Sequence, residues 1–221
     1  MRSRAENRDV GRRLRPVTGG ADPPPHPPAR VPPAAGLAAA LAATLRDRRP
    51  AELPGPGRRA AVLLVLFDRD GESHLLLTKR SDRVPSHPGQ ISLPGGVVEP
   101  QDPTPADAAL RETEEEVGIP AAALRVIGEL DEVSTMVSGF IVRPFVAVAE
   151  EPLSPVPSDA EVARIVEVPV ADLLRADAAL PAEPAPLALR YPLGGEDVWG
   201  ATARILRIFS RVARRSLAAG R

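Results

Sequence analysis

One segment near the middle of the chain, residues 95–119, constrains the fold more than any other. It contains a Gly-Gly turn, a loop and a helix that the sequence bounds at both ends, predicted over 105–117. Thr104 is suited to cap the first turn, and Pro105 suits the first helical position. Gly118 can end the helix in the left-handed conformation. The sequence therefore fixes the limits of this helix.

The predicted helix has an apolar face and a separate acidic face. At about 100° per residue, one group of side chains is placed to bury against a sheet. This group consists of Ala106, Ala109, Leu110, Thr113 and Val117. Glu112, Glu115 and Glu116 share an arc about 100° wide on another face, where the helix dipole and mutual repulsion disfavour acids. The acidic face therefore weakens the isolated helix.

A divalent cation would remove this conflict. Mg²⁺ takes carboxylate oxygens and keeps coordination positions for phosphates and water. Arg111 lies four residues before Glu115 and is placed to hold that carboxylate in position. An ordinary solvated charge run is the alternative interpretation, and the helix pattern by itself leaves both open.

The rest of the chain predicts an α+β fold or a three-layer arrangement. Short apolar runs predict strands at 60–67, 74–80, 124–130, 140–150 and 162–169. Further helices are predicted at 35–49, 170–175 and 201–217. With one acidic helix among several strands, the pattern indicates a single catalytic or binding domain.

Charge and proline content divide the chain into three parts. Residues 1–33 are predicted to be a disordered, basic, Pro-rich tail, 34–58 a helix and linker, and 59–221 the folded domain. The first 58 residues carry eleven arginines against five acids, a net charge of +6, and eleven of the 27 prolines. This tail has no aromatic residue to stack on bases, so no specific nucleic-acid partner is expected.

Composition also excludes several classes of protein. The absence of cysteine excludes disulfides, thiolate metal sites and cysteine nucleophiles. No apolar run approaches the roughly 18 to 20 residues of a membrane span, and no apolar segment follows the basic N-terminus as in a secretory signal. A cytoplasmic protein without a membrane partner is expected, with an organellar address as the alternative for an Arg-rich N-terminus, and a homodimer is left open.

The segment 95–119 resembles the signature of the Nudix hydrolases. Gly96 is followed after five residues by Asp102, and the run from Arg111 to Ile119 contains the Arg-Glu-x-x-Glu-Glu-x-Gly core intact. The departures are Asp102 in place of glutamate, one additional residue before Arg111, and Thr113 in place of a bulky aliphatic residue. The resemblance implies a Nudix-type α/β/α sandwich with a mixed β-sheet.

The preceding segment, residues 75–96, is similar to the extra motif of the coenzyme A diphosphatase (CoA pyrophosphatase) branch of that family. Residues that match this motif are Leu76, Leu77, Thr78, Arg80, Ser81, His87, Gly89, Gln90, Pro94, Gly95 and Gly96. The branch implies metal-dependent hydrolysis of a diphosphate linkage in coenzyme A or a related nucleotide, with Mg²⁺ or Mn²⁺ as cofactor.

The resemblance also implies roles for individual residues. The implied metal ligands are Glu112, Glu115, Glu116 and the Gly96 carbonyl, and the implied catalytic residues are Glu115, Glu116 and Arg111. The implied substrate contacts are Arg80, Ser81, His87, Gly89, Gln90 and Gly95, with Arg83 as a second anion-binding candidate. The general base is left open among Glu115, Glu116, Glu151, Asp159 and Glu161. Trp199, the sole tryptophan, is expected to pack on the last helix rather than to stack on adenine.

Three other functions are compatible with the sequence. One is a Nudix hydrolase of a different nucleoside diphosphate derivative, such as ADP-ribose, and another is a catalytically silent Nudix domain that binds a nucleotide. The third is an acidic interaction protein in which the basic tail does the binding. Intact glutamates favour an enzyme, because a binding module has no need of three mutually repelling acids.

Overall fold

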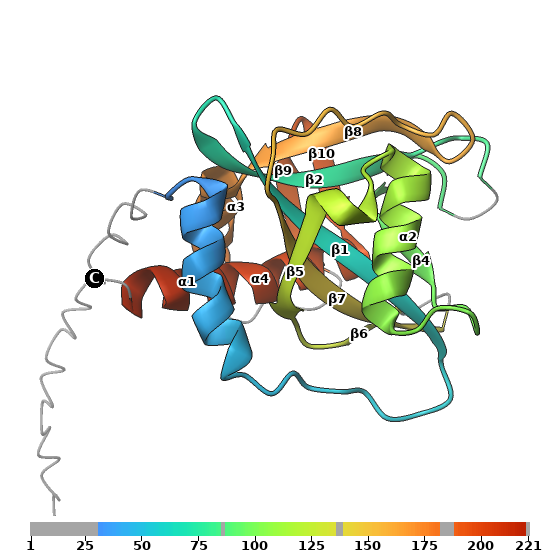
Figure 1. The fold of residues 1–221 in the computed structure, drawn as a ribbon, viewed down its shortest axis with the longest axis horizontal. Helices are drawn as coiled ribbons and strands as arrows, with labels where there is room; N and C mark the ends of the chain where they lie inside the picture. Colours follow the sequence, from blue (N-terminus) through green and yellow to red (C-terminus); the bar gives the residue numbers. More distant parts are fainter. Residues whose placement is uncertain (1–30, 85–86, 136–138, 182–187, 220–221) are drawn as a thin grey trace, which may run out of the picture.

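The computed structural model describes residues 31–84, 87–135, 139–181 and 188–219, and Figure 1 shows how their helices and strands are arranged. The predicted tail lies outside the described residues up to residue 30. In the described part of the chain, no helix combines the length and apolar character that crossing a membrane requires.

A mixed β-sheet forms the centre of the molecule. β1 (Arg58–Arg69) runs parallel to β7 (Phe140–Ala149) and antiparallel to β2 (Glu72–Arg80). β8 (Val162–Pro169) pairs with β2, and β5 (Leu124–Glu129) pairs with β7, both antiparallel. The middle of β1 is apolar on both faces, which is typical of a strand covered by helices on either side.

Three very short strands complete the sheet. β3 (Ile91–Ser92) pairs with β2, β4 (Gly95–Val97) pairs with β1, and β6 (Val133–Ser134) pairs with β7. The sequence did not reveal them, because two or three residues are too few to show an alternating pattern. β4 carries the Gly-Gly turn, so this short strand positions the predicted site.

Helices lie on both faces of the sheet, which confirms the predicted α/β/α sandwich. One face carries α2 (Pro105–Val117), found at its predicted limits, followed by the 3₁₀ turn η1 (Ala121–Ala123). The second layer contains α1 (Ala34–Arg46), α3 (Val170–Ala178), α4 (Gly200–Ala219) and a hairpin of β9 (Arg190–Leu193) and β10 (Glu196–Trp199).

Alternating residues of the strands divide the core into two. In β1, Leu63 and Val65 pack with the α2 layer, whereas Leu64 and Leu66 pack with the opposite layer. This division follows from the two-residue period of a strand. The sheet thus separates two apolar cores, and the acidic helix belongs to the smaller one.

Helix α1 is part of the folded core, although it precedes the predicted domain. Leu37 and Leu41 are fully buried in the same cluster as the residues of α4. The Ala34 N–H donates to Asp68 Oδ1 at 2.6 Å, which ties the start of the helix to the end of β1. The helix ends at Arg46, three residues before its predicted end, because Asp47 already caps it.

Candidate active site

The Gly95–Gly96 turn brings β4 into close contact with both β1 and α2. Gly95 has a φ of +142°, and a Cβ there would lie 2.3 Å from the Ala61 carbonyl oxygen. A Cβ on Gly96 would lie 2.4 Å from the carboxylate carbon of Glu112. Position 95 therefore requires glycine, whereas a side chain at position 96 would have to displace the Glu112 carboxylate. The backbone of β4 is exposed directly to this acidic side chain of α2.

Glu116 is the most buried acid of the helix, with 4% of its surface exposed. Gly95 N–H donates to its Oε2 at 3.3 Å. Burial raises the pKa of Glu116 to about 8; the Gly95 N–H and the charge of Arg80 oppose this increase, while Glu161 and Glu112 add to it. The carboxylate therefore lies in a site that is deficient in positive charge.

Glu112 lies one helical turn before Glu116, and its carboxylate faces Gly96. Burial raises the pKa of Glu112, and the charges of Glu115 and Glu161 act in the same direction. Arg111 opposes the increase, donating from Nη1 to Glu112 Oε1 at 3.0 Å. The half-buried Glu112 and the buried Glu116 thus both face the Gly95–Gly96 turn.

Arg111 closes the loop before the helix. It donates from Nε and Nη2 to the two carboxylate oxygens of Asp102, at 3.0 and 3.1 Å, and from Nη2 to the Val97 carbonyl at 3.3 Å. The hydrogen bond from Arg111, together with the Glu99 N–H, lowers the pKa of Asp102. Aspartate, although shorter than the expected glutamate, therefore makes a bidentate ion pair across the longer loop.

Glu115 is placed differently from the other two glutamates of its arc. Its side chain is 61% exposed and contacts Arg111 Nη1 at 3.4 Å, so the predicted pairing is present. Arg111 makes its shorter contacts with Asp102 and Glu112. Among the described residues, no three acidic or histidine side chains are already gathered as a metal site requires. The structure brings Glu112 and Glu116 together with Gly95 and Gly96, but not Glu115.

The apolar face of α2 also differs in detail from its prediction. Thr113 and Val117 are buried as predicted, and the Thr113 hydroxyl donates to the Ala109 carbonyl at 2.6 Å. Leu110 is only half-buried, whereas Ala108 is fully buried. The helix is therefore rotated toward its acidic side, and this rotation brings Glu116 under the sheet.

The loop after β2 is held firmly at its base. Arg80 N–H donates to the Gln90 carbonyl at 3.0 Å, and Gly89 N–H donates to the Arg80 carbonyl at 3.1 Å. Ser81 is buried, and its hydroxyl accepts a hydrogen bond from the Arg83 N–H at 3.2 Å. These contacts fix the predicted substrate residues Arg80, Ser81, Gly89 and Gln90 at the end of β2.

His87, the remaining residue predicted from this loop, is exposed and has a φ of +55°. Its carbonyl accepts a hydrogen bond from the Gln90 N–H at 3.3 Å. Its backbone therefore shapes the turn, while the imidazole lies at the surface.

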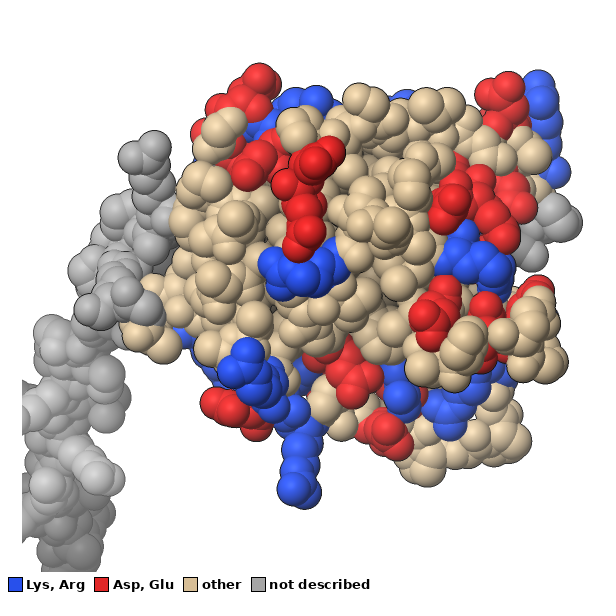
Figure 2. Space-filling model, viewed as in Figure 1, with Lys and Arg blue, Asp and Glu red and all other residues tan. Residues whose placement is uncertain are grey.

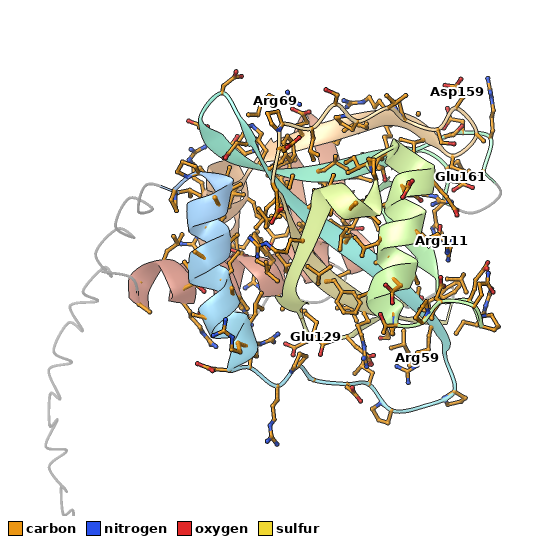
Figure 3. All side chains as sticks on the ribbon, viewed as in Figure 1. Arg59, Arg69, Arg111, Glu129, Asp159 and Glu161 are labelled. Atoms are coloured by element: carbon orange, nitrogen blue, oxygen red, sulfur yellow. The ribbon has the colours of Figure 1, made fainter. Side chains whose placement is uncertain are left out.

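The segment between β7 and β8 packs on the end of α2 and brings another acid to the site. Ser158 N–H donates to the Glu116 carbonyl at 2.8 Å, and Ser81 N–H donates to the Glu161 carbonyl at 2.8 Å. Figure 3 shows Glu161 on the same side of α2 as Arg111. Of the three loop acids considered as bases, Glu161 is the one whose charge raises the pKa of both Glu112 and Glu116.

The surface view agrees with this electrostatic picture. In Figure 2, acidic side chains gather with a few basic ones over α2 and the loops beside it. Oxygen donors of this kind, two carboxylates and a glycine carbonyl, suit a hard divalent cation such as Mg²⁺. The site therefore has the charge and the donor atoms that a metal-bound polyphosphate would need.

Trp199 is not a core residue. It is 41% exposed at the end of β10, so any packing on the last helix leaves much of the indole in water. The packing that was expected of it is supplied by Tyr191 and Val198, which are fully buried in the hairpin. The hairpin was not predicted, so the sequence did not show which of its residues face outward.

Comparisons with known proteins agree with this site. The family model described as NUDIX domain matches residues 57–189. The "Uncharacterized Nudix hydrolase NudL" of Enterobacter sp. (strain 638) is 38% identical over 166 residues, covering 68% of this chain and 80% of the relative. The protein of the same name from Yersinia enterocolitica serotype O:8 / biotype 1B (strain NCTC 13174 / 8081) is 40% identical over 131 residues. That match covers 59% of this chain and 66% of the relative, just under two thirds of its length.

A solved structure, the NUDIX hydrolase from Alicyclobacillus acidocaldarius, superimposes with a TM-score of 0.50 at 20% identity. The superposition covers 76% of this chain and 98% of that one. At this identity the likeness concerns the fold alone, and it agrees with the observed sandwich. The names of the two curated relatives give no substrate.

Proposed function

The chain belongs to the NUDIX domain family, and from this membership we propose that it hydrolyses the diphosphate linkage of coenzyme A or a CoA derivative. The products would be 3′,5′-ADP and 4′-phosphopantetheine. The observation that carries the proposal is the hydrogen bond at 3.3 Å from the N–H of Gly95, at the end of segment 75–96, to the buried Glu116. The charge of Arg80, in the same segment, also lowers the pKa of that carboxyl. The loop that resembles the CoA diphosphatase motif is thereby joined to the acidic helix in one site.

The acids of the site imply a divalent cation. A diphosphate is a polyanion, and it approaches Glu112, Glu116 and Glu161 only if cations balance the charge. We assign Glu112, Glu116 and the Gly96 carbonyl as the residues that would hold Mg²⁺ or Mn²⁺. Glu115 would join them by turning away from Arg111. Its contact with Arg111 is 3.4 Å, longer than the 3.0 Å contacts that Arg111 makes with Asp102 and Glu112. When bound, the metal neutralises the diphosphate and lowers the pKa of a water.

The protein's own residues orient the substrate. Arg80 offers a guanidinium suited to a phosphate, and the backbone pairing with Gly89 and Gln90 keeps the end of β2 rigid around it. Arg111 acts indirectly, by holding Glu112 through a hydrogen bond from Nη1. Its bidentate ion pair with Asp102 fixes the orientation of the guanidinium that makes this contact.

The reaction also needs a proton acceptor. The oxygen of water bonds to one phosphorus while the bridging P–O bond breaks, and the attacking water loses a proton. The charge of Glu161, from another element, acts on both the half-buried Glu112 and the buried Glu116, and Glu161 is not assigned as a metal ligand. We therefore assign this proton to its carboxylate. Asp159, exposed in the same segment, provides a matched control.

The experiment that tests the function measures hydrolysis of CoA and ADP-ribose side by side, with Mg²⁺ or Mn²⁺ and with EDTA. Products are resolved by chromatography for the wild type, Glu116→Gln, Glu161→Gln and Asp159→Asn. Metal-dependent release of 3′,5′-ADP from CoA, lost in Glu116→Gln, reduced in Glu161→Gln and kept in Asp159→Asn, is expected. Turnover of ADP-ribose alone would overturn the assignment of CoA as the substrate. If neither compound is hydrolysed, the proposed CoA hydrolysis is overturned, and hydrolysis of ADP-ribose is excluded with it.

A further inference from the structure

The sole tryptophan of the chain lies on the surface near the candidate site. Among the described residues, Trp199 and Val156 are the large hydrophobic side chains that are exposed, at 41% and 67%. An indole contributes far more apolar area than a valine side chain, and leaving it in water forgoes that burial. A tryptophan that leaves this much of its surface in water is therefore a candidate for ligand contact.

A guanidinium accompanies the indole. Arg190 lies opposite Trp199 in the β9–β10 pairing, and its Cζ is 5.7 Å from the ring centroid, within the range of a cation–π contact. Arg190 also pairs with Asp197, two residues before Trp199 on the outer face of the hairpin. All three side chains are exposed, so this arrangement contributes little to stability and leaves the indole accessible.

The hairpin is fixed to the site by several contacts. Lys79, next to Arg80, donates to Glu196 of β10 at 3.0 Å. Thr202 Oγ1 donates to the Ile91 carbonyl at 3.1 Å. A Cβ on Gly200, the residue after Trp199, would lie 3.5 Å from the side-chain amide of Gln90.

These contacts limit how far the indole lies from the diphosphate position. Ile91 is four residues from Gly95, a span of at most about 14 Å in an extended chain. Trp199 precedes Gly200, which lies beside Gln90. An extended nucleotide-containing substrate whose diphosphate lies at the Gly95–Gly96 turn is therefore long enough to reach this part of the hairpin.

We propose that Trp199, with Arg190 beside it, binds the aromatic base of the substrate's nucleotide half and so determines specificity. The inference rests on the proposed function, which supplies a substrate with a base on one side of the diphosphate. A base has a π-face that stacks on an indole, whereas the phosphopantetheine half offers only alkyl and amide groups. The combination of an indole and a guanidinium therefore favours the base over the other half.

Tryptophan fluorescence gives a direct test, because Trp199 is the only tryptophan. The wild-type protein is titrated separately with 3′,5′-ADP and with 4′-phosphopantetheine, and emission is excited at a wavelength where adenine does not absorb. Saturable quenching by 3′,5′-ADP and none by 4′-phosphopantetheine is expected. Quenching by 4′-phosphopantetheine alone, or by neither compound in a protein that hydrolyses CoA, would overturn the inference.

Kinetics of variants give an independent test. In Trp199→Ala, KM for CoA should rise about 5- to 150-fold, the range expected when a base loses an aromatic stacking partner, with a much smaller change in kcat. Trp199→Phe should restore most of the affinity, and Val156→Ala, which alters the other exposed hydrophobic residue, should leave KM unchanged. Thermal unfolding should be the same in all four proteins, because the indole is not in the core.

An unchanged KM in Trp199→Ala would overturn the inference while leaving CoA hydrolysis in place. If the wild type hydrolyses ADP-ribose and not CoA, the substrate assignment fails, and the same variants are compared on ADP-ribose, whose adenine should require Trp199 equally. If neither is hydrolysed, the titration decides: quenching by 3′,5′-ADP supports the base subsite, and its absence overturns it.

Discussion

Two of the glutamates that the structure describes are buried, and their surroundings differ sharply. Glu132, between β5 and β6, accepts hydrogen bonds from the Leu53 N–H at 2.8 Å, from Arg59 Nη1 at 3.0 Å and from Arg143 Nε at 3.0 Å. Glu116, in α2, is equally buried, yet it accepts one N–H bond from Gly95 at 3.3 Å. One carboxylate is surrounded by donors, and the other is nearly without them.

The protonation of the two side chains reflects this difference. Burial by itself raises the pKa of Glu132, but the Leu53 N–H and the guanidinium groups of Arg143 and Arg59 outweigh it, so the net pKa is lowered. At Glu116 burial prevails, and the pKa rises to about 8. Burial of a carboxylate is thus structural where the fold supplies its counter-charges, and it marks a functional site where a ligand must supply them.

Substitution should separate the two glutamates most clearly in catalysis. Glu116→Gln should lower kcat for CoA roughly 10³-fold, because it removes a negative charge that would hold the metal ion needed for the reaction. Glu132→Gln should retain kcat within a few-fold per folded molecule. Both are measured in the same assay with Mn²⁺, and Glu114→Gln, an exposed acid of the same helix, serves as the control. Comparable losses at positions 116 and 132 would contradict the distinction.

The pH dependence of stability should have opposite signs at the two positions. A raised folded pKa means that Glu116 favours folding when protonated, so its contribution in EDTA declines as the pH rises from about 4.5 to about 8. Glu116→Gln should remove this decline, which denaturant unfolding at several pH values will show. Adding Mn²⁺ at pH 8 should stabilise the wild type and have much less effect on the variant. A wild type whose stability does not change between these pH values would refute the raised pKa.

Glu132→Gln should lower the free energy of unfolding by about 2 kcal/mol at pH 7, less than for a fully buried ion pair because Arg59 is half exposed. A lowered folded pKa stabilises the fold above the ordinary glutamate pKa, and this gain disappears as the pH falls through the folded value. The difference between variant and wild type should therefore vanish in acid. Glu52→Gln, an exposed partner of Arg143, should cost under about 0.5 kcal/mol.

The smallest effect is expected at the residue that acts on the site through another. Asp102→Asn should lower kcat/KM for CoA about 10-fold, because Arg111 loses its bidentate partner and holds Glu112 less firmly. The loss should be accompanied by a higher Mn²⁺ concentration for half-maximal activity, which a merely structural role would not change. Asp102→Glu should restore part of the activity. Asp107→Asn, at the helix start, is the control, and an equal loss there would contradict a specific role for Asp102.

Much of the fold followed from local patterns. Helix α2 and strand β8 occur at their predicted limits, because end-capping residues and β-branched runs act over a few neighbouring positions. The hairpin of β9 and β10 was missed, since Pro192 and the short length of its strands obscure the alternating pattern. The exposure of Trp199 was missed for the same reason.

The candidate site was predictable in part. Spacing placed Glu112 and Glu116 on one arc, and the structure brings both to the Gly95–Gly96 turn. Spacing did not show that Glu115 would stay at the surface, because it gives the arc but not the rotation of the helix against the sheet, which decides which edge of the arc is buried. The contribution of Glu161 depends on the packing of a distant loop, and no local pattern indicated it among the other acids.

By itself, the sequence determined the limits of the acidic helix, the need for glycine beside it, and the family to which the chain belongs, because each depends on residues close together in the chain. Only the tertiary structure decided which glutamate is buried with too little counter-charge to offset its burial, which loop acid acts on it, and which aromatic side chain remains exposed. These properties arise from solvent exclusion and from charges on different elements, and both are set only when the sheet, helices and loops pack together.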